Sequence, residues 1–145
     1  MWIERDLESQ LSRSASQRPV VVLTGARQTG KTSLVRRVFP DHSFVSLDLP
    51  SEAALAERDP HDFLARHQPP LIVDEVQYAP GLFRHLKVAV GADRRRNGRF
   101  ILTGSQKFVL MQETSESLAG RAEILAQRTG NYCILDACDK CCPHK

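Results

Sequence analysis

VVVLTGARQTGKT, residues 20–32, is the stretch that decides the fold of this chain. It opens with apolar and β-branched residues, continues through a loop bounded by Gly25 and Gly30, and enters a helical pattern at Lys31. Strand, glycine-bounded loop and helix in this order form the context that a phosphate-binding loop requires. The match to G-x-x-x-x-G-K-[ST] is complete, so the stretch predicts a site for nucleotide phosphates.

Each residue type in the loop has a physical task. Gly25 and Gly30 allow backbone angles that a Cβ would oppose, so backbone N–H groups can point inward at a phosphate. The N-terminus of the following helix favours the same anion. Lys31 supplies a cation for the β- and γ-phosphates, and the Thr32 hydroxyl is placed to coordinate Mg²⁺. The alternative is an ordinary glycine-containing turn with a surface lysine. The expected phosphate-binding residues are Gly25, Ala26, Arg27, Gln28, Thr29, Gly30, Lys31, Thr32 and Ser33.

Length and composition place the chain among ordinary globular domains. Its 145 residues are enough for one domain with a substantial core, and 41% hydrophobic and 26% charged residues are typical values. The net charge of +3 is too small to indicate nucleic-acid binding by itself. There is no apolar run of the ~18 residues that a membrane span needs, and the N-terminus lacks the apolar core of a signal peptide. We therefore expect a cytoplasmic protein with no membrane segment.

Strand and helix patterns alternate along the rest of the chain. Alternation of this kind predicts a three-layer α/β fold, with a mostly parallel central sheet and helices on both faces. Apolar residues recur every four positions in the first helix, which we expect to pack against the edge of the sheet. Helices are expected at residues 2–17, 31–39, 51–58, 60–67 and 80–93, with a broken helix over 108–119. Strands are expected at residues 20–24, 42–48, 71–73, 100–104 and 122–125.

Two adjacent acids follow the apolar run Leu71-Ile72-Val73. Functional groups collect at the carboxyl ends of parallel strands, so Asp74 and Glu75 are expected beside the phosphate loop. Asp74 is a candidate for ordering Mg²⁺ directly or through water, and Glu75 for accepting a proton from the water that attacks the γ-phosphate. The alternative for this pair is a solvent-exposed turn at the end of a strand.

Two further strand ends carry polar groups. Asp48 ends one strand, and Thr103-Gly104-Ser105 ends another. Ser105 is a candidate for sensing the γ-phosphate by a hydrogen bond, and its alternative role is that of N-cap for the next helix.

Taken together, these motifs resemble the AAA-type P-loop ATPases. The likeness is closer to a bacterial and archaeal group in which such an ATPase core precedes a C-terminal domain of unknown function. It covers about residues 3–125 and implies ATP and Mg²⁺ binding, Walker-B roles for Asp74 and Glu75, and a sensor role for Ser105. It also implies that Arg121 is a cation able to reach a phosphate of its own or a neighbouring subunit, although a surface arginine after a glycine turn is the alternative. The likeness is carried by residues 23–32, 46–48, 74–80, 102–106 and 117–121.

The last part of the chain departs from this pattern. We expect a partial ATP-binding core over residues 1–125 and an atypical, poorly ordered tail over 126–145, as in a truncated or frame-shifted product. The tail holds all four cysteines, and Cys138, Cys141, Cys142 and His144 have a spacing that zinc can use, although no second ligand pair exists elsewhere. Free thiols are the alternative.

The sequence leaves several functions open. The first is Mg²⁺-dependent ATP hydrolysis with Lys31 on the phosphates, and the second is a nucleotide-binding remnant or interaction module without turnover. A small-molecule kinase fits the loop but fits the adjacent acids less well. A homo-oligomer or a protein partner is plausible by resemblance. The basic turn of Arg94, Arg95, Arg96 and Arg99 is compatible with nucleic acid or with an acidic face of a partner, but a solvated connection before a strand is the preferred explanation.

Overall fold

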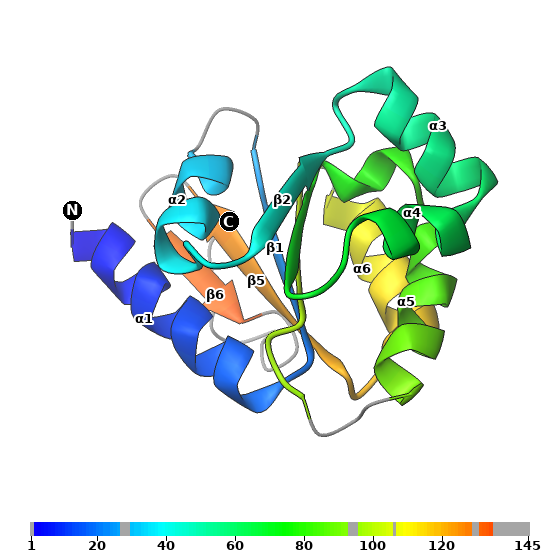
Figure 1. Ribbon diagram of the computed structural model, residues 1–145. Coiled ribbons are helices and arrows are strands. Elements are labelled where there is room, and N and C mark those ends of the chain that lie inside the picture. Colours follow the sequence, from blue (N-terminus) through cyan, green and yellow to red (C-terminus); the bar gives the residue numbers. More distant parts are fainter. Residues whose placement is uncertain (1, 27–29, 93–95, 106, 129–130, 135–145) are drawn as a thin grey trace.

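A six-stranded sheet lies between two layers of helices in the computed structural model, which describes residues 2–26, 30–92, 96–105, 107–128 and 131–134 (Figure 1). The strand order is β2-β3-β4-β1-β5-β6; the first five strands are parallel, and β6 runs antiparallel to β5. The predicted three-layer α/β fold is therefore confirmed. The strands are β1 (Val20–Gly25), β2 (Ser43–Ser46), β3 (Leu71–Asp74), β4 (Phe100–Gly104), β5 (Ala122–Arg128) and β6 (Asn131–Ile134).

The helices divide unequally between the two faces of the sheet (Figure 1). One face carries α1 (Trp2–Gln17) and α2 (Lys31–Val38). The other face carries the remaining helices, and the 3-10 turn η1 (Val76–Tyr78) follows β3 on that side. These remaining helices are α3 (Pro50–Arg58), α4 (Pro60–Arg66), α5 (Leu82–Ala92) and α6 (Lys107–Ser117).

Strand β1 lies inside the sheet and is buried on both faces. Val20 and Val22 face the layer of α3 to α6, whereas Val21 and Leu23 face α1 and α2. Alternate side chains of a strand point to opposite faces, so a strand between two helical layers must be apolar at every position. This requirement explains the continuous apolar run that precedes the phosphate loop.

The first helix covers a face of the sheet, not its edge. Leu7 and Leu11 of α1 are fully buried and pack in one cluster with Val21 and Leu23 of β1 and with Leu125 of β5. The expected packing against the sheet edge was wrong because the edge next to β5 is occupied by β6, which the sequence analysis did not anticipate.

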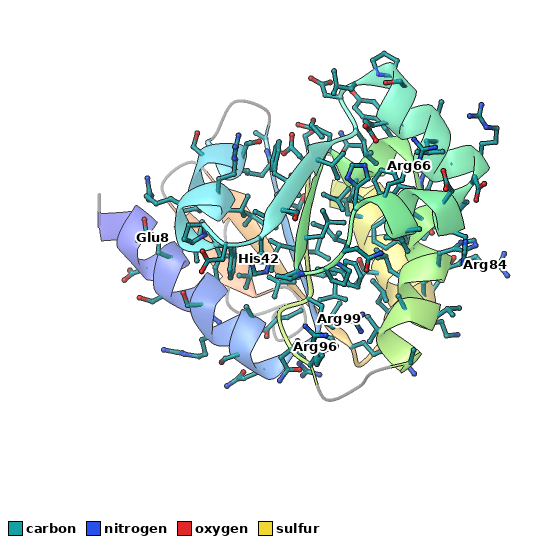
Figure 2. The ribbon with its side chains drawn as sticks, viewed as in Figure 1. Glu8, His42, Arg66, Arg84, Arg96 and Arg99 are labelled. Atoms are coloured by element: carbon teal, nitrogen blue, oxygen red, sulfur yellow. The ribbon has the colours of Figure 1, made fainter. Side chains whose placement is uncertain are left out.

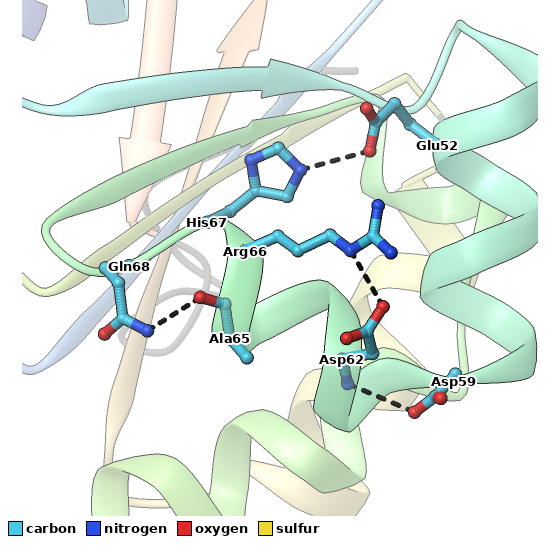
Figure 3. Close-up of polar contacts among 7 residues, drawn as sticks. All are labelled: Glu52, Asp59, Asp62, Ala65, Arg66, His67 and Gln68. Carbon is cyan, nitrogen blue, oxygen red and sulfur yellow. Dashed lines mark hydrogen bonds and ion pairs between the residues drawn. The ribbon is translucent and has the colours of Figure 1, made fainter.

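Helices α3 and α4 form a hairpin fixed by local polar contacts (Figure 3). Asp59 caps α4, since its Oδ1 accepts a hydrogen bond from the Asp62 N–H at 3.1 Å. Arg66 Nε contacts Asp62 Oδ2 at 2.8 Å, and His67 Nε2 lies 3.1 Å from Glu52 Oε1. The first two contacts lie within α4, and the contact between His67 and Glu52 joins the end of α4 to α3.

Two elements differ from the sequence-based expectation. Helix α6 is continuous over 107–117, because Thr114 takes the buried position between Leu110 and Leu118 and so interrupts the apolar pattern without interrupting the helix. Strand β5 runs on to Arg128, and β6 pairs with it over 131–134, so the sheet reaches beyond the boundary expected at residue 125. Residues 135–145 of the expected tail lie outside the described residues. None of the described helices is long and apolar enough to span a membrane.

Candidate functional site

The carboxylate of Asp74 is the centre of the candidate site. Asp74 is the last residue of β3 and is 7% exposed. Its carboxylate accepts hydrogen bonds from hydroxyl groups on three other elements. Thr32 Oγ1 of α2 and Thr103 Oγ1 of β4 each donate to Asp74 Oδ1 at 2.7 Å. Ser46 Oγ of β2 donates to Oδ2 at 3.0 Å. These hydrogen bonds offset the cost of burying a carboxylate, so the group is held rigidly next to the first turn of α2.

The structure brings Thr32 and Asp74 together, as the sequence predicts. Thr32 follows β1 and Asp74 ends β3, although these two strands are not neighbours in the sheet. Strand β4 lies between β1 and β3, and its Thr103 completes the set of donors. Asp48, a candidate from the sequence, is exposed, and β2 ends already at Ser46. Ser46 therefore takes the position at the strand end, and the Asp48 N–H donates to Ser46 Oγ at 3.1 Å.

Lys31 is the first residue of α2 and is 5% exposed. Its Nζ donates to the backbone oxygen of Ala26 at 2.7 Å and to that of Gly25 at 3.2 Å. Gly30 precedes it with φ 83°, a left-handed conformation that favours glycine. The lysine ammonium is thus folded back over the start of its own loop. Three members of the expected phosphate-binding set, Arg27, Gln28 and Thr29, lie outside the described residues, and Ser33 is exposed on α2.

Glu75 follows Asp74 in a left-handed backbone conformation, with φ 58°. Its N–H donates to Thr103 Oγ1 at 3.3 Å, and its Oε1 accepts from Gln77 Nε2 at 2.7 Å. Gln77 Nε2 also lies 3.2 Å from Ser105 Oγ, at the end of β4. The structure therefore brings Asp74, Glu75 and Ser105 into one network at the carboxyl edge of the sheet.

Gln77 is the member of this network that reasoning from the residues missed. In the sequence, Gln77 stands out only as part of residues 74–80, a stretch that carries the family resemblance. The sequence does contain a signal, because Gln77 is a polar residue among the apolar residues of 76–79. The structure shows that its side chain is buried, with 6% exposed. A buried glutamine needs hydrogen-bond partners, and the two acids just before it were the nearest candidates.

Arg121 does not join the site of its own chain. It stands immediately before β5, where its backbone oxygen accepts from the Val20 N–H at 3.2 Å at the start of β1. The phosphate loop follows the other end of this six-residue strand, roughly 16–20 Å away at about 3.3 Å per residue. Arg121 instead borders two surface hollows, of about 1100 and 410 Å³, which contain none of Lys31, Asp74 or Glu75. Contact with a phosphate of a neighbouring subunit stays a prediction.

The other candidate binding groups divide between described and undescribed residues. In the basic turn, Arg99 Nη1 donates to the Ala89 oxygen at 3.0 Å, so it ties β4 to α5, while Arg96 is exposed (Figure 2). Arg94 and Arg95 lie outside the described residues, as do Cys138, Cys141, Cys142 and His144. Within the described parts of the chain, no group of three or more His, Cys, Asp or Glu side chains could hold a metal ion.

Comparison with protein families agrees with this geometry. A parallel sheet in which a lysine and a hydroxyl residue follow β1, and the hydroxyl bonds to an acid at the end of β3, is typical of the class of P-loop NTPase domains. A family model described as "AAA domain" matches residues 17–129. The chain belongs to this AAA domain family, and membership supports nucleotide binding and an ATPase-like function in general.

Two curated relatives are 40% identical to this chain over 130 residues. They are the uncharacterized proteins Rv2008c of Mycobacterium tuberculosis and Mb2031c of Mycobacterium bovis. The match takes in 86% of this chain, but the chain spans only 29% of the length of these relatives.

Solved structures share the fold at low sequence identity. The P-loop NTPase domain of a sigma-54 transport activator from E. coli superposes with a TM-score of 0.56 and 19% identity, covering 85% of this chain and 93% of that one. The Walker-type ATPase PABY2304 of Pyrococcus abyssi gives 0.56 and 20%, covering 87% and 53%. At this identity the comparisons establish the fold alone.

Proposed function

We propose that this domain binds ATP together with Mg²⁺ and hydrolyses it. The observation that carries the proposal is the juxtaposition of Thr32, which follows Lys31, with the buried carboxylate of Asp74, at 2.7 Å. This hydrogen bond between the first turn of α2 and the last residue of β3 supports a shared nucleotide site, because hydrolysis needs the phosphate loop and the acid close together.

The oxygen atoms of the site suit a Mg²⁺ ion. Thr32 Oγ1 and Asp74 Oδ1 already lie side by side, and hard divalent cations prefer hydroxyl and carboxylate oxygens. Ser46 and Thr103 fix the Asp74 carboxylate from the other sides. When bound, Mg²⁺ supplies positive charge that offsets the charge of the phosphates. Thr32 and Asp74 are the residues that would hold it.

Lys31 and Glu75 have the two remaining tasks in the proposal. On nucleotide binding, Lys31 leaves the carbonyls of Gly25 and Ala26 and pairs with the phosphates. Glu75 orients a water molecule and takes its proton as the water oxygen bonds to the γ-phosphorus. The bond from that phosphorus to the bridging oxygen then breaks, which yields ADP and inorganic phosphate. The Ser105 hydroxyl donates a hydrogen bond to the γ-phosphate.

Wider features of the function are also proposals. Arg121 lies at the end of the strands opposite the phosphate loop. This position suits a role in a homo-oligomer, where one subunit completes the site of another. A protein partner is the alternative, and nucleic acid is supported only by the exposed Arg96 of the basic turn. A cytoplasmic location stays a prediction from the sequence. Because the chain spans only 29% of the length of its curated relatives, any activity or partner of those whole proteins is also no more than a proposal for this chain.

Calorimetry with ATP and Mg²⁺ tests binding. Lys31→Ala is expected to abolish it, because the cation that neutralises the phosphates is lost. The matched control is Lys87→Ala on the exposed side of α5, which is expected to bind as the wild type does. Equal ATP affinity in the wild type and Lys31→Ala would refute the site.

Phosphate release tests turnover separately. Glu75→Gln is expected to keep ATP binding and to lose about 10²–10⁴-fold in kcat, the usual contribution of a positioned general base. Retained binding with equally slow release from the wild type and Glu75→Gln would favour the second function, nucleotide binding without turnover.

A further inference from the structure

Gln77 holds two groups of the candidate site at once. Its side chain is 6% exposed, and the single nitrogen of its amide lies 2.7 Å from Glu75 Oε1 and 3.2 Å from Ser105 Oγ. An amide nitrogen carries two hydrogens, so it can serve both acceptors simultaneously. No other described side chain is recorded in hydrogen bonds to both Glu75 and Ser105.

The orientation of the amide follows from chemistry. An ionised carboxylate only accepts hydrogen bonds, so the nitrogen of Gln77 must face Glu75. Its Oε1 then faces Gly104, where a Cβ would stand only 2.6 Å away. Among the described residues this buried oxygen has no hydrogen-bond partner. The orientation of the amide is therefore determined by its two acceptors, Glu75 Oε1 and Ser105 Oγ. The absence of a side chain at Gly104 leaves room for the amide oxygen.

The same geometry sets the roles of Glu75 and Ser105. Because Ser105 Oγ accepts from Gln77, its own hydrogen must point elsewhere and can be donated to an anion. Because Gln77 anchors Oε1 of Glu75, the second carboxylate oxygen can accept a proton from water. The left-handed backbone of Glu75 is unfavourable for a residue with a Cβ. The hydrogen bonds of this network hold the residue there.

We propose that Gln77 is a positioning residue, which fixes Glu75 as a proton acceptor and Ser105 as a hydroxyl donor to the γ-phosphate. This inference rests on the proposed ATP site. It adds that the water-activating group and the γ-phosphate sensor are coupled through one amide, so loss of that amide impairs both turnover and the discrimination of ATP from ADP.

Gln77→Met tests the first effect, since methionine keeps the length and volume of glutamine and removes both donors. We expect kcat for ATP hydrolysis to fall about tenfold or more, with KM changed less than threefold, because the fall is part of what a positioned base contributes. Gln68→Leu is the control: Gln68 is exposed before β3, and within the described residues its Nε2 makes a local hydrogen bond to the Ala65 oxygen (Figure 3). It should leave kcat unchanged.

The ratio of ATP to ADP affinity, measured by calorimetry, tests the second effect without any turnover. The ratio is expected to fall about tenfold in Gln77→Met and by the same factor in Ser105→Ala. If Gln77→Met fails to fold, the ratio measured for Ser105→Ala still tests the hydrogen-bond chain. The double variant should lose no more than either single variant, because both act through one hydrogen-bond chain.

The outcomes separate the two proposals. A kcat and an affinity ratio of Gln77→Met equal to those of the wild type would overturn the role of Gln77 alone, as would an unchanged ratio in Ser105→Ala or independent losses that multiply in the double variant. ATP binding without turnover in the wild type would remove the hydrolytic function, and the affinity ratio would still decide on Gln77. Absence of ATP binding by the wild type would overturn both.

Discussion

Thr103 shows how much one hydroxyl contributes to the site. It is fully buried in β4, donates to Asp74 and accepts from the Glu75 N–H. Thr103→Val keeps the shape and leaves a buried carboxylate without one of its donors. We expect a loss of about 1–3 kcal/mol in the free energy of unfolding, measured by urea denaturation.

Thr24 provides the matched control for that substitution. It is also fully buried in a parallel strand, but no hydrogen-bond partner of its Oγ1 is found among the described residues. Thr24→Val removes an unpaired hydroxyl, so we expect stability to stay equal or to rise by up to about 1 kcal/mol. Equal losses in both variants would mean that the hydrogen bond to Asp74 is not the cause.

At the scale of residues, the sequence predicted the types of group in the site better than their partners. Lys31, Thr32 and Asp74 follow from the motif because a phosphate loop and a buried strand impose their positions. Ser46 and Gln77 could not be assigned from spacing, since their roles depend on where β2 ends and on how η1 turns after Glu75. Such contacts arise only when separate elements meet.

Among the elements, the entry to β4 depends on a tight approach to the end of α1. Gly98 has φ 69°, and a Cβ there would stand 2.9 Å from the Ala15 backbone oxygen. His42 Nε2 also lies 2.8 Å from the Gly98 oxygen. Gly98→Ala is expected to cost about 1–3 kcal/mol of stability, through both the left-handed conformation and the clash.

Gly91 provides the control for the substitution of Gly98. Gly91 lies in α5 with nothing within 4 Å of the position of a Cβ, so Gly91→Ala should raise stability by about 0.5–1 kcal/mol. Thermal denaturation of the two variants beside the wild type measures both effects. A destabilised Gly91→Ala would contradict this description of α5.

Helix α6 carries a carboxyl group whose ionisation opposes folding. Burial raises the pKa of Glu113 above its usual value, and the charges of Glu116 and Glu57 raise it further. The folded state therefore binds this proton more strongly than the unfolded state, and stability falls as pH rises from the ordinary carboxyl pKa through the raised one. Glu113→Gln should be more stable than the wild type at pH 7, by no more than about 0.5 kcal/mol, and should lose this advantage at pH 4. An advantage that is equal at both pH values would exclude the charge as its cause.

The helices and strands also show where sequence patterns suffice. Strands β1 and β3 were predicted from their apolar runs because burial on both faces leaves no other solution. Strand β6 escaped prediction, since its short segment Asn131-Tyr132-Cys133-Ile134 has an edge position and gains its structure by pairing with β5. The face on which α1 packs could not be read from its apolar stripe either, because a stripe does not identify its partner.

For the whole molecule, ligand binding should appear as a gain in thermal stability. At a concentration 100 times Kd, ATP with Mg²⁺ adds about 2.7 kcal/mol, or roughly 5–11 °C in Tm for a domain of this size. Chelation of Mg²⁺ with EDTA should reduce the gain, and Lys31→Ala should remove it. A gain of the same size in Lys31→Ala would place nucleotide binding elsewhere on the molecule.

The folded-back Lys31 has a consequence for how binding is observed. Its ammonium already satisfies two carbonyl oxygens, so an arriving triphosphate exchanges contacts instead of making entirely new ones. The heat released will therefore understate the strength of the new ion pairs, because the disrupted lysine contacts are subtracted from it. Small anions such as sulfate, which offer fewer oxygens in return, should compete poorly for this loop.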